Sequence, residues 1–318
     1  MDRQGSVATL RAAVAEFARV HLPDVEPWCV ALSGGADSLA LTAVAARLRS
    51  TTALIVDHGL QADSGRVAAT AREQALSVGC VDAQVLRVDV GSAGGPEAAA
   101  RTARYAALNA ARGAAPVLLG HTLDDQAETV LLGLGRGSGA RSIAGMRPYD
   151  PPWCRPLLGV RRAVGHAACA ELTLTPWQDP HNADPRFTRV RLRSEVLPLL
   201  EAVLGGGVAE ALARTAAALR EDNDMLDDQA ARVEAMTDAE LDTAALAKLP
   251  VAVRRRVIRG WLIAGGASDL TDGQIRGVDR LVTDWRGQGG VAVGSALRNQ
   301  RLFAGRRAGA LITYREPV

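Results

Sequence analysis

Four short apolar segments recur along the first 120 residues, and stretches with helical hydrophobic spacing separate them. The apolar segments are 29–32, 53–56, 85–90 and 116–119, and the helical patterns between them cover 37–49, 64–78 and 96–113. Segments of this length with helices between them are typical of βαβ units, which build parallel sheets. The sequence therefore predicts an α/β fold with a Rossmann-like parallel sheet and helices on both faces.

Polar motifs follow three of these segments, at the points where the predicted strands end. They are Ser-Gly-Gly-Ala-Asp-Ser at 33–38, Val-Asp-His-Gly at 56–59 and Gly-His at 120–121. Ligands of parallel α/β sheets bind at the carboxyl ends of the strands. We therefore expect the three motifs to contribute to one site.

The first motif fits a turn that binds phosphate. Gly34 and Gly35 allow a sharp turn whose backbone N–H groups can approach an anion. The helix that begins near Asp37 adds unpaired N–H groups and the positive end of its dipole. Ser33 and Ser38 add hydroxyl donors, and Asp37 is a carboxylate suited to magnesium beside phosphates. A Walker A loop fits poorly because its Gly-Lys-Ser/Thr ending is absent. The alternative is a turn in which Asp37 and Ser38 only cap a helix.

A helix predicted after the fourth strand carries two carboxylates on one face. Thr122 fits the N-cap of this helix, and Asp125 stands in the capping-box position. Asp124 and Glu128 are four residues apart, so their carboxylates share one face near the positive end of the helix. They suit a magnesium ion or the removal of a proton from an amine. Capping and dipole compensation alone are the alternative.

The charge of the chain is unevenly distributed although its total is only +2. Residues 221–242 hold nine acids and one arginine, whereas 243–318 hold thirteen basic and five acidic residues, a local net charge of +8. We predict a catalytic domain over 1–207, a connecting helix over 208–242 and a smaller helical α+β domain over 243–318. The basic charge suits RNA binding; an inert basic surface is the alternative.

The remaining composition excludes several classes of protein. The four cysteines form neither a C-x-x-C pair nor a Cys/His cluster, which argues against structural zinc and iron–sulfur sites. There is no run of 18 apolar residues, and the N-terminal segment has helical spacing with an internal Glu16 rather than a signal-peptide pattern. We expect a cytoplasmic protein with no membrane partner.

The order of the motifs resembles that of PP-loop ATP pyrophosphatases and, more specifically, of tRNA(Ile)-lysidine synthetases. The motifs that carry this resemblance lie at 33–38, 56–60, 97–105, 120–139, 155–158 and 179–189. The resemblance is strong over 28–200 and weaker over 243–318. Two positions depart from the family pattern: Val190 stands where the family usually has asparagine, and Thr122 stands where it often has a second histidine.

The resemblance implies an ATP-dependent ligase that modifies tRNA. Enzymes of this family adenylate O2 of the wobble cytidine (C34) in an isoleucine tRNA with a CAU anticodon, and the ε-amine of free L-lysine then attacks C2, which releases AMP and leaves lysidine. The implied cofactors are ATP and Mg²⁺, and the sequence leaves a homodimer open. One alternative is a PP-loop enzyme that thiolates a tRNA base, although such enzymes need reactive cysteines. Another is a noncatalytic nucleotide-binding RNA module, against which the acidic residues of the motifs argue.

The expected site residues fall into four groups. The catalytic group is Asp37, His121, Asp124, Glu128 and Arg193. The nucleotide-binding group is Ser33, Gly34, Gly35, Ala36, Asp37, Ser38, Val56, Asp57 and Arg101. The tRNA-binding group is Arg104, Arg186, Arg189, Arg191, Arg254 and Arg255, and the metal ligands are Asp37 and Asp124.

Overall fold

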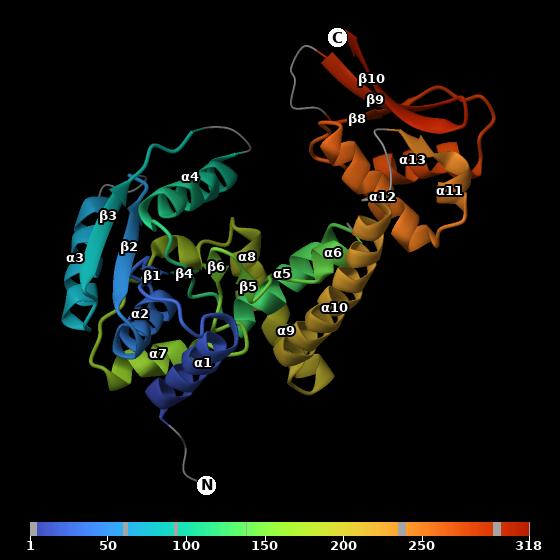
Figure 1. Cartoon of the computed structure of the whole chain (residues 1–318). Coiled ribbons are helices and arrows are strands. Elements are labelled where there is room, and N and C mark those ends of the chain that lie inside the picture. The colour runs from blue at the N-terminus through green and yellow to red at the C-terminus, as the bar shows by residue number, and fades with distance from the viewer. Residues whose placement is uncertain are drawn as a thin grey trace. The chain divides into compact units, whose positions relative to one another are not determined.

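The chain forms two compact units, each with its own core (Figure 1). The computed structural model describes residues 5–59, 63–91, 95–137, 139–234, 240–294 and 300–317, without the side chains of 96, 97 and 234. Unit 1 comprises Met1–Leu132 and Gly145–Thr215, and unit 2 comprises Gly133–Ala144 and Ala216–Val318. Of the motifs and charged residues considered above, Leu60, Ser138, Asp238, Arg298 and the side chains of Glu97 and Glu234 lie outside the described part.

Unit 1 is built on a six-stranded sheet with the order β3-β2-β1-β4-β6-β5. Its strands are β1 (Trp28–Ala31), β2 (Thr51–Asp57), β3 (Asp82–Arg87), β4 (Val117–Leu118), β5 (Tyr149–Asp150) and β6 (Trp153–Cys154). All neighbours are parallel except β5 and β6. Strand β1 lies between β2 and β4, where Val30 pairs with Ala53 and Leu118. The predicted parallel sheet is confirmed, and β5 and β6 extend it beyond the four predicted strands.

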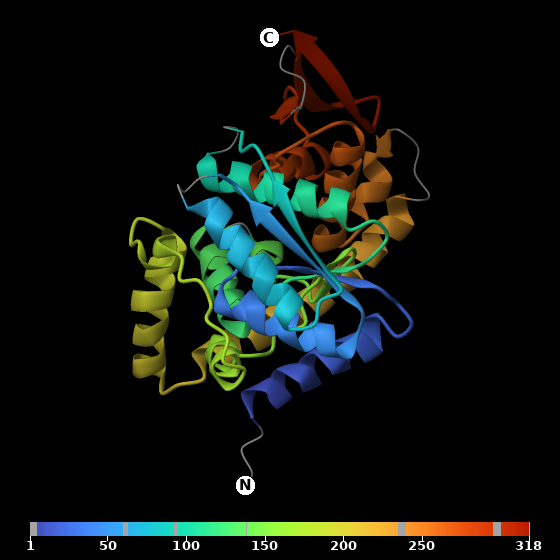
Figure 2. The same ribbon diagram turned by 90° about the vertical axis from the view of Figure 1, so that its left-hand side faces the viewer.

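Helices cover both faces of this sheet, as predicted (Figures 1 and 2). They are α1 (Ser6–His21), α2 (Ala36–Leu48), α3 (Ser64–Ser77), α4 (Pro96–Ala111), α5 (Leu123–Gly135) and α7 (Arg162–Glu171). Because side chains alternate along a strand, Val30 packs in the core with α1, α2, α3 and α7, whereas Cys29 packs in a second core with Leu108 of α4. Helix α2 is apolar almost all round because it is buried between the sheet, α1 and α7.

Unit 1 ends in short helical segments and the start of a long helix. These are η1 (Pro180–Ala183), α8 (Thr188–Arg191), the π-helical turn η2 (Leu192–Val196), α9 (Leu197–Leu204) and α10 (Val208–Glu234). Leu197 and Ala209 pack against Leu123 and Ala127 of α5, so the first turns of α10 belong to the core of unit 1. The two units divide inside α10, after Thr215.

Within the described ranges no single helix is long and apolar enough to cross a membrane. One bent pair, Thr188–Leu204 with Val208–Val233, meets that test of length and composition when its two helices are taken together across a 96° bend.

Unit 2 combines helices with an antiparallel sheet of order β7-β10-β9-β8. Its elements are α6 (Ala140–Ile143), β7 (Leu241–Asp242), α11 (Thr243–Ala247), α12 (Val251–Ala264), α13 (Asp272–Thr283), β8 (Val291–Val293), β9 (Gln300–Arg307) and β10 (Ala310–Pro317). Val257 of α12, Val278 of α13 and Leu311 of β10 share one core with the last part of α10. The predicted small α+β domain is confirmed.

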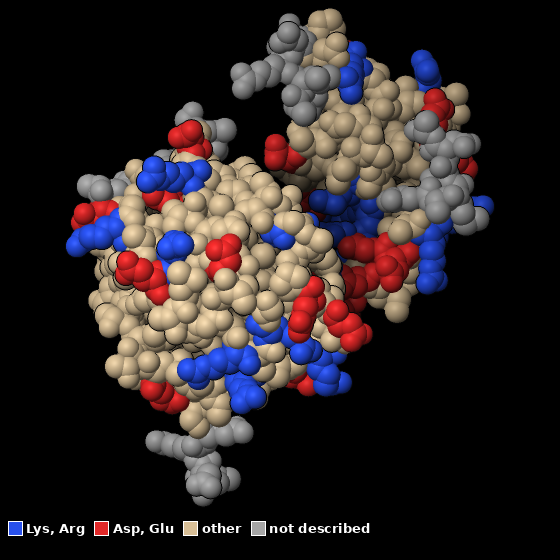
Figure 3. Space-filling view, turned by 60° about the vertical axis from the view of Figure 1, so that its left-hand side comes forward, with Lys and Arg blue, Asp and Glu red and all other residues tan. Residues whose placement is uncertain are grey.

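Charged side chains of both signs are interspersed on the surface of unit 1 that Figure 3 shows. The fields of interspersed opposite charges partly cancel, so this face does not present a single basic field. Whether an arginine that is expected to bind tRNA can meet a phosphate therefore depends on its own partners.

Candidate active site

The turn at 33–38 leaves the first turn of α2 open. The Ser38 hydroxyl accepts from Ser33 N–H at 3.2 Å and donates to the Gly35 carbonyl at 2.9 Å, so it closes the turn and does not cap the helix. No side chain caps α2. Gly34 has φ of +85°, which residues with a side chain rarely adopt. The uncapped N–H groups at this end of α2 form the kind of site that binds phosphate.

Two further glycines allow other segments to approach this turn closely. A Cβ atom at Gly120, after β4, would lie 3.0 Å from the backbone nitrogen of Ser38. A Cβ atom at Gly165, in α7, would lie 2.7 Å from Oδ1 of Asp37. Both approaches depend on the absence of a side chain. The start of α2 is therefore held in place by β4 and α7 as well as by its own turn.

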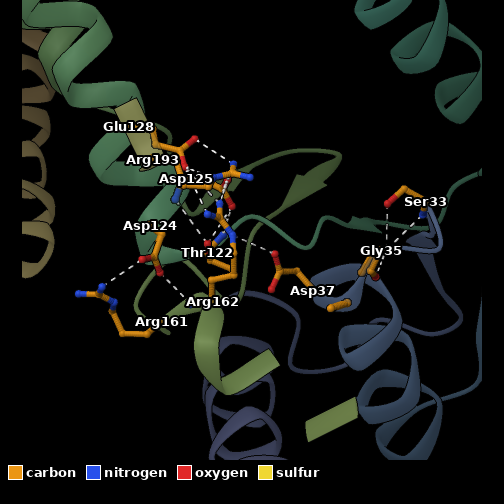
Figure 4. Close-up of polar contacts among 12 residues, drawn as sticks. Ser33, Gly35, Asp37, Thr122, Asp124, Asp125, Glu128, Arg161, Arg162 and Arg193 are labelled. Atoms are coloured by element: carbon orange, nitrogen blue, oxygen red, sulfur yellow. Dashed lines mark hydrogen bonds and ion pairs between the residues drawn. The ribbon is translucent and has the colours of Figure 1, made fainter. Parts of the chain in front are cut away.

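Asp37 is the carboxylate of the turn, and one of its oxygens has no hydrogen-bond partner. Oδ1 is buried and unpaired within the described part of the chain, and Oδ2 lies 3.4 Å from Nε of Arg162 (Figure 4). Burial raises the pKa of Asp37 to about 6, although the charge of Arg162 acts in the opposite direction. A buried, unpaired carboxylate oxygen beside a phosphate-binding turn fits a ligand of Mg²⁺.

The capping of α5 follows the sequence prediction. Asp125 Oδ2 accepts hydrogen bonds from the backbone N–H and the hydroxyl of Thr122 at 2.8 and 2.9 Å, and Asp125 N–H donates to the Thr122 hydroxyl at 3.4 Å. This reciprocal arrangement is a capping box. Because Asp125 makes the cap, Asp124 and Glu128 are not needed for it.

Three carboxylates of α5 form a cluster that we call the acidic wall, and arginines pair with it (Figure 4). They belong to Asp124, Asp125 and Glu128. The guanidinium of Arg162 lies 2.6 Å from Asp125 Oδ1 and 3.3 Å from Glu128 Oε1. Arg193 Nε donates to Glu128 Oε1 at 2.8 Å. The side chain of Glu128 is 0% exposed, so this carboxylate depends entirely on its arginine partners.

Both oxygens of Asp124 are also engaged. Oδ2 accepts from the backbone N–H of Arg162 at 2.7 Å, and Oδ1 lies 3.1 Å from the guanidinium of Arg161. Among the described residues no group of three His, Cys, Asp or Glu side chains could hold a metal ion. Of the two expected metal ligands, Asp124 thus has a protein partner for each oxygen, whereas Oδ1 of Asp37 has none among the described residues.

A second cluster, which we call the basic cluster, lies at the ends of β2, β4 and β6. Its members are His58, Arg101, Arg104, Tyr105, His121 and Arg155. Burial and the positive charges of Arg104, Arg155 and Arg101 lower the pKa of His121 to about 4, against the opposite effect of Asp125. Burial and Arg104 also lower the pKa of His58. Both imidazoles are therefore neutral at pH 7.

Tyr105 organises the arginines of the basic cluster. Its ring packs edge-on against Trp153 at 4.6 Å between centroids, and the guanidiniums of Arg101 and Arg104 lie 4.9 and 5.4 Å from its centroid. Arg101 donates a hydrogen bond to the Tyr105 hydroxyl at 3.4 Å, and Arg155 also bonds this side chain. Burial alone would raise the pKa of Tyr105, but the three arginines lower it overall.

Val56 and Asp57 lie at the carboxyl end of β2, next to the end of β1, as the sequence predicted. Asp57 Oδ1 accepts from the backbone N–H of Gly59 at 3.0 Å, and this bond, with one to Ser64, lowers the pKa of Asp57. Asp57 is therefore an ionised residue that shapes the turn after β2.

Comparisons with known proteins agree with this geometry. Residues 9–200 match the family model of a PP-loop domain, and residues 241–309 match that of the TilS substrate binding domain. The tRNA(Ile)-lysidine synthases of Mycobacterium tuberculosis (strain ATCC 25618 / H37Rv) and Mycobacterium leprae (strain TN) are 74% and 69% identical to this chain, and each alignment covers 100% of both proteins. The chain belongs to the tRNA(Ile)-lysidine synthase family.

A solved structure outside the tRNA(Ile)-lysidine synthase family shares the fold. The U34-tRNA thiolase NcsA from Methanococcus maripaludis, with its [4Fe-4S] cluster, aligns with a TM-score of 0.53 at 17% identity, over 68% of this chain and 80% of that one. At this identity the likeness concerns the fold alone.

The structure accounts for one departure from the usual tRNA(Ile)-lysidine synthase pattern. Thr122, which replaces a histidine, is 2% exposed and supplies the hydroxyl of the capping box. At the second departure, the backbone carbonyl of Val190 accepts from the Ser194 hydroxyl at 2.9 Å, and nothing in the structure explains the loss of the usual asparagine side chain.

The arginines over 186–193 differ in their partners and in their exposure. Arg193 points inward to Glu128, while Arg186 pairs with Asp184 at 2.7 Å and Arg191 pairs with Glu195 at 3.0 Å. Arg189 is half-buried. The ion pairs of Arg186 and Arg191 are exposed. A phosphate could replace either carboxylate at little cost, because an exposed ion pair contributes only about 0–1 kcal/mol to stability.

Arg254 and Arg255, two of the expected tRNA contacts, form ion pairs inside unit 2. Arg254 is 8% exposed, and its Nε lies 2.6 Å from Asp279 Oδ1. Arg255 shares the same carboxylate, with 2.9 Å between its Nε and Asp279 Oδ2. Both arginines connect α12 to α13 through Asp279, and Arg254 is buried in this ion pair.

Three residues of the site had no assigned role in the sequence analysis: Arg161, Arg162 and Arg155. Arg155 belongs to a motif that was recognised, but its contact with Tyr105 spans 50 residues and leaves no local signal. Arg162 is the first residue of α7, where a basic residue usually opposes the helix dipole. Asp37 and the acidic wall compensate this unfavourable position. The position is the one sequence signal that could have revealed the role of Arg162.

Proposed function

We propose that this protein uses ATP to ligate L-lysine to C2 of cytidine 34 in the isoleucine tRNA with a CAU anticodon, which yields lysidine, AMP and diphosphate. The observation that carries the proposal is the 74% identity over the whole length to relatives named tRNA(Ile)-lysidine synthase, in a chain whose phosphate-binding turn is intact. The coarser activity, ATP use by a PP-loop tRNA-modifying enzyme, agrees with both family matches.

Two steps account for the products. In the first, O2 of the cytosine attacks the α-phosphorus of ATP, the bond from this phosphorus to the bridging oxygen breaks, and diphosphate leaves. In the second, the uncharged ε-amine of lysine attacks C2, the C2–O2 bond breaks, and AMP leaves with that oxygen. The attacking nitrogen loses a proton as the new C–N bond is completed.

The residues of the turn would bind the triphosphate. The open N–H groups of α2 and its dipole favour the negative phosphates, and the Ser33 and Ser38 hydroxyls hold the turn in shape. A bound Mg²⁺ would neutralise phosphate charge and polarise the bond that breaks. Asp37 would hold this ion through the oxygen that has no protein partner.

The acidic wall would position the arginines rather than act as a free base. Glu128 is buried between Arg162 and Arg193, and Asp124 binds Arg161 and the backbone of Arg162. Arg193 and Arg162 thereby stand beside Asp37 and the turn, where guanidinium groups can stabilise charge that develops during phosphoryl chemistry.

The two alternative functions find less support. All four cysteines are free and buried, and burial raises the pKa values of Cys80 and Cys169 to about 11, so these thiols are poor nucleophiles for sulfur transfer. A noncatalytic module would not need the buried network around Asp37 and Arg162. We therefore retain the ligase as the proposal.

The test is a reaction of the full-length protein with ATP, isotope-labelled lysine and a CAU isoleucine tRNA transcript. Digestion of the RNA and mass spectrometry of the nucleosides should reveal labelled lysidine with one AMP formed for each. A transcript with U34 in place of C34, and a reaction without ATP, should give none. A thiolated nucleoside formed with a sulfur donor, or ATP binding without any AMP, would replace the proposal by one of the alternatives.

A further inference from the structure

The basic cluster holds an unusual number of unsatisfied buried nitrogen atoms. Nδ1 of His58, Nδ1 of His121, Nε of Arg104 and Nε of Arg155 are buried without a hydrogen-bond partner in the part of the chain that the structure describes. Arg155 is only 7% exposed. Buried polar groups without partners are rare because each costs free energy, and several at one place indicate a site for a ligand.

The charge of the cluster is also uncompensated. None of Arg101, Arg104 and Arg155 forms an ion pair with a carboxylate within the described ranges. The acid that acts on His121 is Asp125, which is already bound by Arg162 and Thr122. Arg155 is buried, Arg104 is half-buried and Arg101 is exposed. Guanidinium charge that no carboxylate neutralises favours an anion.

The cluster is separate from the phosphate-binding turn although it lies at the same edge of the sheet. His58 follows β2 and His121 follows β4, the two neighbours of β1. Arg104 lies on α4, which packs on the opposite face of the sheet from α2. The turn leads into α2, so the two sets of donors flank the end of β1 from different faces.

We propose that Arg104, Arg155, His58 and His121 form a second phosphate site, which binds a backbone phosphodiester of the tRNA next to the cytidine that is modified. This inference rests on the proposed function. The guanidinium fork matches the geometry of phosphate oxygens, and a neutral imidazole can donate its free N–H to a third oxygen.

The reaction itself explains why RNA, rather than ATP, would fill this site. The open end of α2 provides for the triphosphate on one face of the sheet. The reacting cytosine must reach the α-phosphate at the same edge, and its ribose brings a phosphodiester on each side. A second phosphate site on the α4 face would fix one of these and so orient the base for attack.

The test combines a protein substitution with a chemical change in the RNA. An anticodon stem-loop of the CAU isoleucine tRNA is synthesised with a neutral methylphosphonate at single positions around C34, and its affinity for the full-length protein is measured without ATP or lysine. Arg104→Gln should weaken binding of the unmodified stem-loop about tenfold or more. One methylphosphonate should weaken wild-type binding similarly and add little to the loss in Arg104→Gln.

Two controls make the result specific. Arg47→Gln removes an exposed arginine at the far end of α2, at the opposite edge of the sheet, and should show no coupling to any methylphosphonate. His58→Ala provides a second variant of the cluster, should Arg104→Gln fail to fold, and should couple to the same phosphate. In both variants of the cluster, the affinity for ATP should stay within about twofold of the wild-type value. Loss of a charged hydrogen bond to ATP would weaken this affinity by more than about twofold.

Additive losses at every methylphosphonate position would overturn the proposal, and so would a loss of ATP affinity in place of RNA affinity, which would assign the cluster to the nucleotide. Lysidine formation by the wild-type protein is measured on the same preparation. If lysidine forms and no coupling is seen, only the phosphate site is wrong. If coupling is seen without lysidine, the site stands and the proposed function is wrong.

Discussion

The guanidinium of Arg162 lies 3.4 Å from Oδ2 of Asp37, and it contacts Asp125 and Glu128 of α5 at the same time. Arg162 is 17% exposed and Glu128 is fully buried. One side chain from α7 thus connects the phosphate-binding turn to the acidic wall. The carboxylates of both elements depend on it.

Arg162→Met should therefore destabilise the protein by about 3–5 kcal/mol, because it leaves buried carboxylates without a partner. Arg161→Met is the matched control: Arg161 is 42% exposed, so its loss should cost only about 1 kcal/mol. Urea unfolding measures both. Adding Glu128→Gln to Arg162→Met should recover part of the loss, and equal costs for the two arginines would contradict this reading.

Asp37→Asn should abolish AMP formation while the protein becomes more stable at neutral pH. The pKa of Asp37 is raised to about 6 from 3.8, so the folded state binds the proton more tightly than the unfolded state does. The wild type should consequently lose stability as pH rises from about 4 to about 6, by at most about 3 kcal/mol, and the variant should not. Denaturation curves at several pH values, with an AMP assay, check both parts. Substantial AMP formation in this variant would remove Asp37 from the mechanism.

His121 should give the opposite pH dependence. Its pKa is lowered to about 4 from 6.5, so the unfolded state binds the proton more tightly, and stability should fall as pH decreases from about 6.5 to about 4. His121→Gln should reduce this loss of stability at low pH by at most about 3 kcal/mol. His166→Gln, at an exposed position of α7, serves as the control. An unchanged acid limb in His121→Gln would show that this imidazole is not held neutral by its surroundings.

In unit 2, Asp279→Leu should cost about 3–5 kcal/mol because it leaves the buried guanidinium of Arg254 unpaired. The double variant Arg254→Met/Asp279→Leu should recover most of that stability. Since Arg254 is buried, the double variant should also keep the tRNA affinity of the wild type, which filter binding can measure. A large loss of tRNA affinity in a folded double variant would show instead that Arg254 contacts RNA.

A fragment that ends after Thr215 should bind ATP but lose most of its tRNA affinity. It retains the part of α10 that packs on Leu123 and Leu197, whereas a fragment that ends at Gly205 exposes these residues and should aggregate. The logarithm of tRNA affinity should fall less steeply with the logarithm of salt concentration than in the full-length protein, because the basic 243–318 segment is absent. Equal slopes would show that this segment does not bind RNA.

The sequence predicted the parts of the fold and site that depend on neighbouring residues. The turn at 33–38 and the capping box of Thr122 and Asp125 are local patterns, and both are found as expected. The strands β5 and β6 were not predicted, because neither lies in an apolar segment such as the one that revealed the equally short β4.

The partners of the charged residues were harder to predict, because they come from distant parts of the chain. Asp37 and Arg162 are 125 residues apart, and Glu128 meets Arg193 across 65 residues. Sequence patterns identified the carboxylates of the acidic wall but could not show that arginines pair with them. Asp124 was therefore predicted to bind a metal. In the same way, Arg254 and Arg255 were expected to bind tRNA, and the sequence could not show that both pair with Asp279.

The close approach of Gly120 and Gly165 to the start of α2 has a consequence for ligand affinity. Segments from β4 and α7 restrict the turn before any nucleotide arrives, so the loss of its conformational entropy occurs when the protein folds. Little further ordering is then needed on binding, and preorganisation of this kind strengthens affinity without adding a contact. Alanine at either glycine should therefore weaken ATP binding through a looser turn, although neither residue needs to touch the nucleotide.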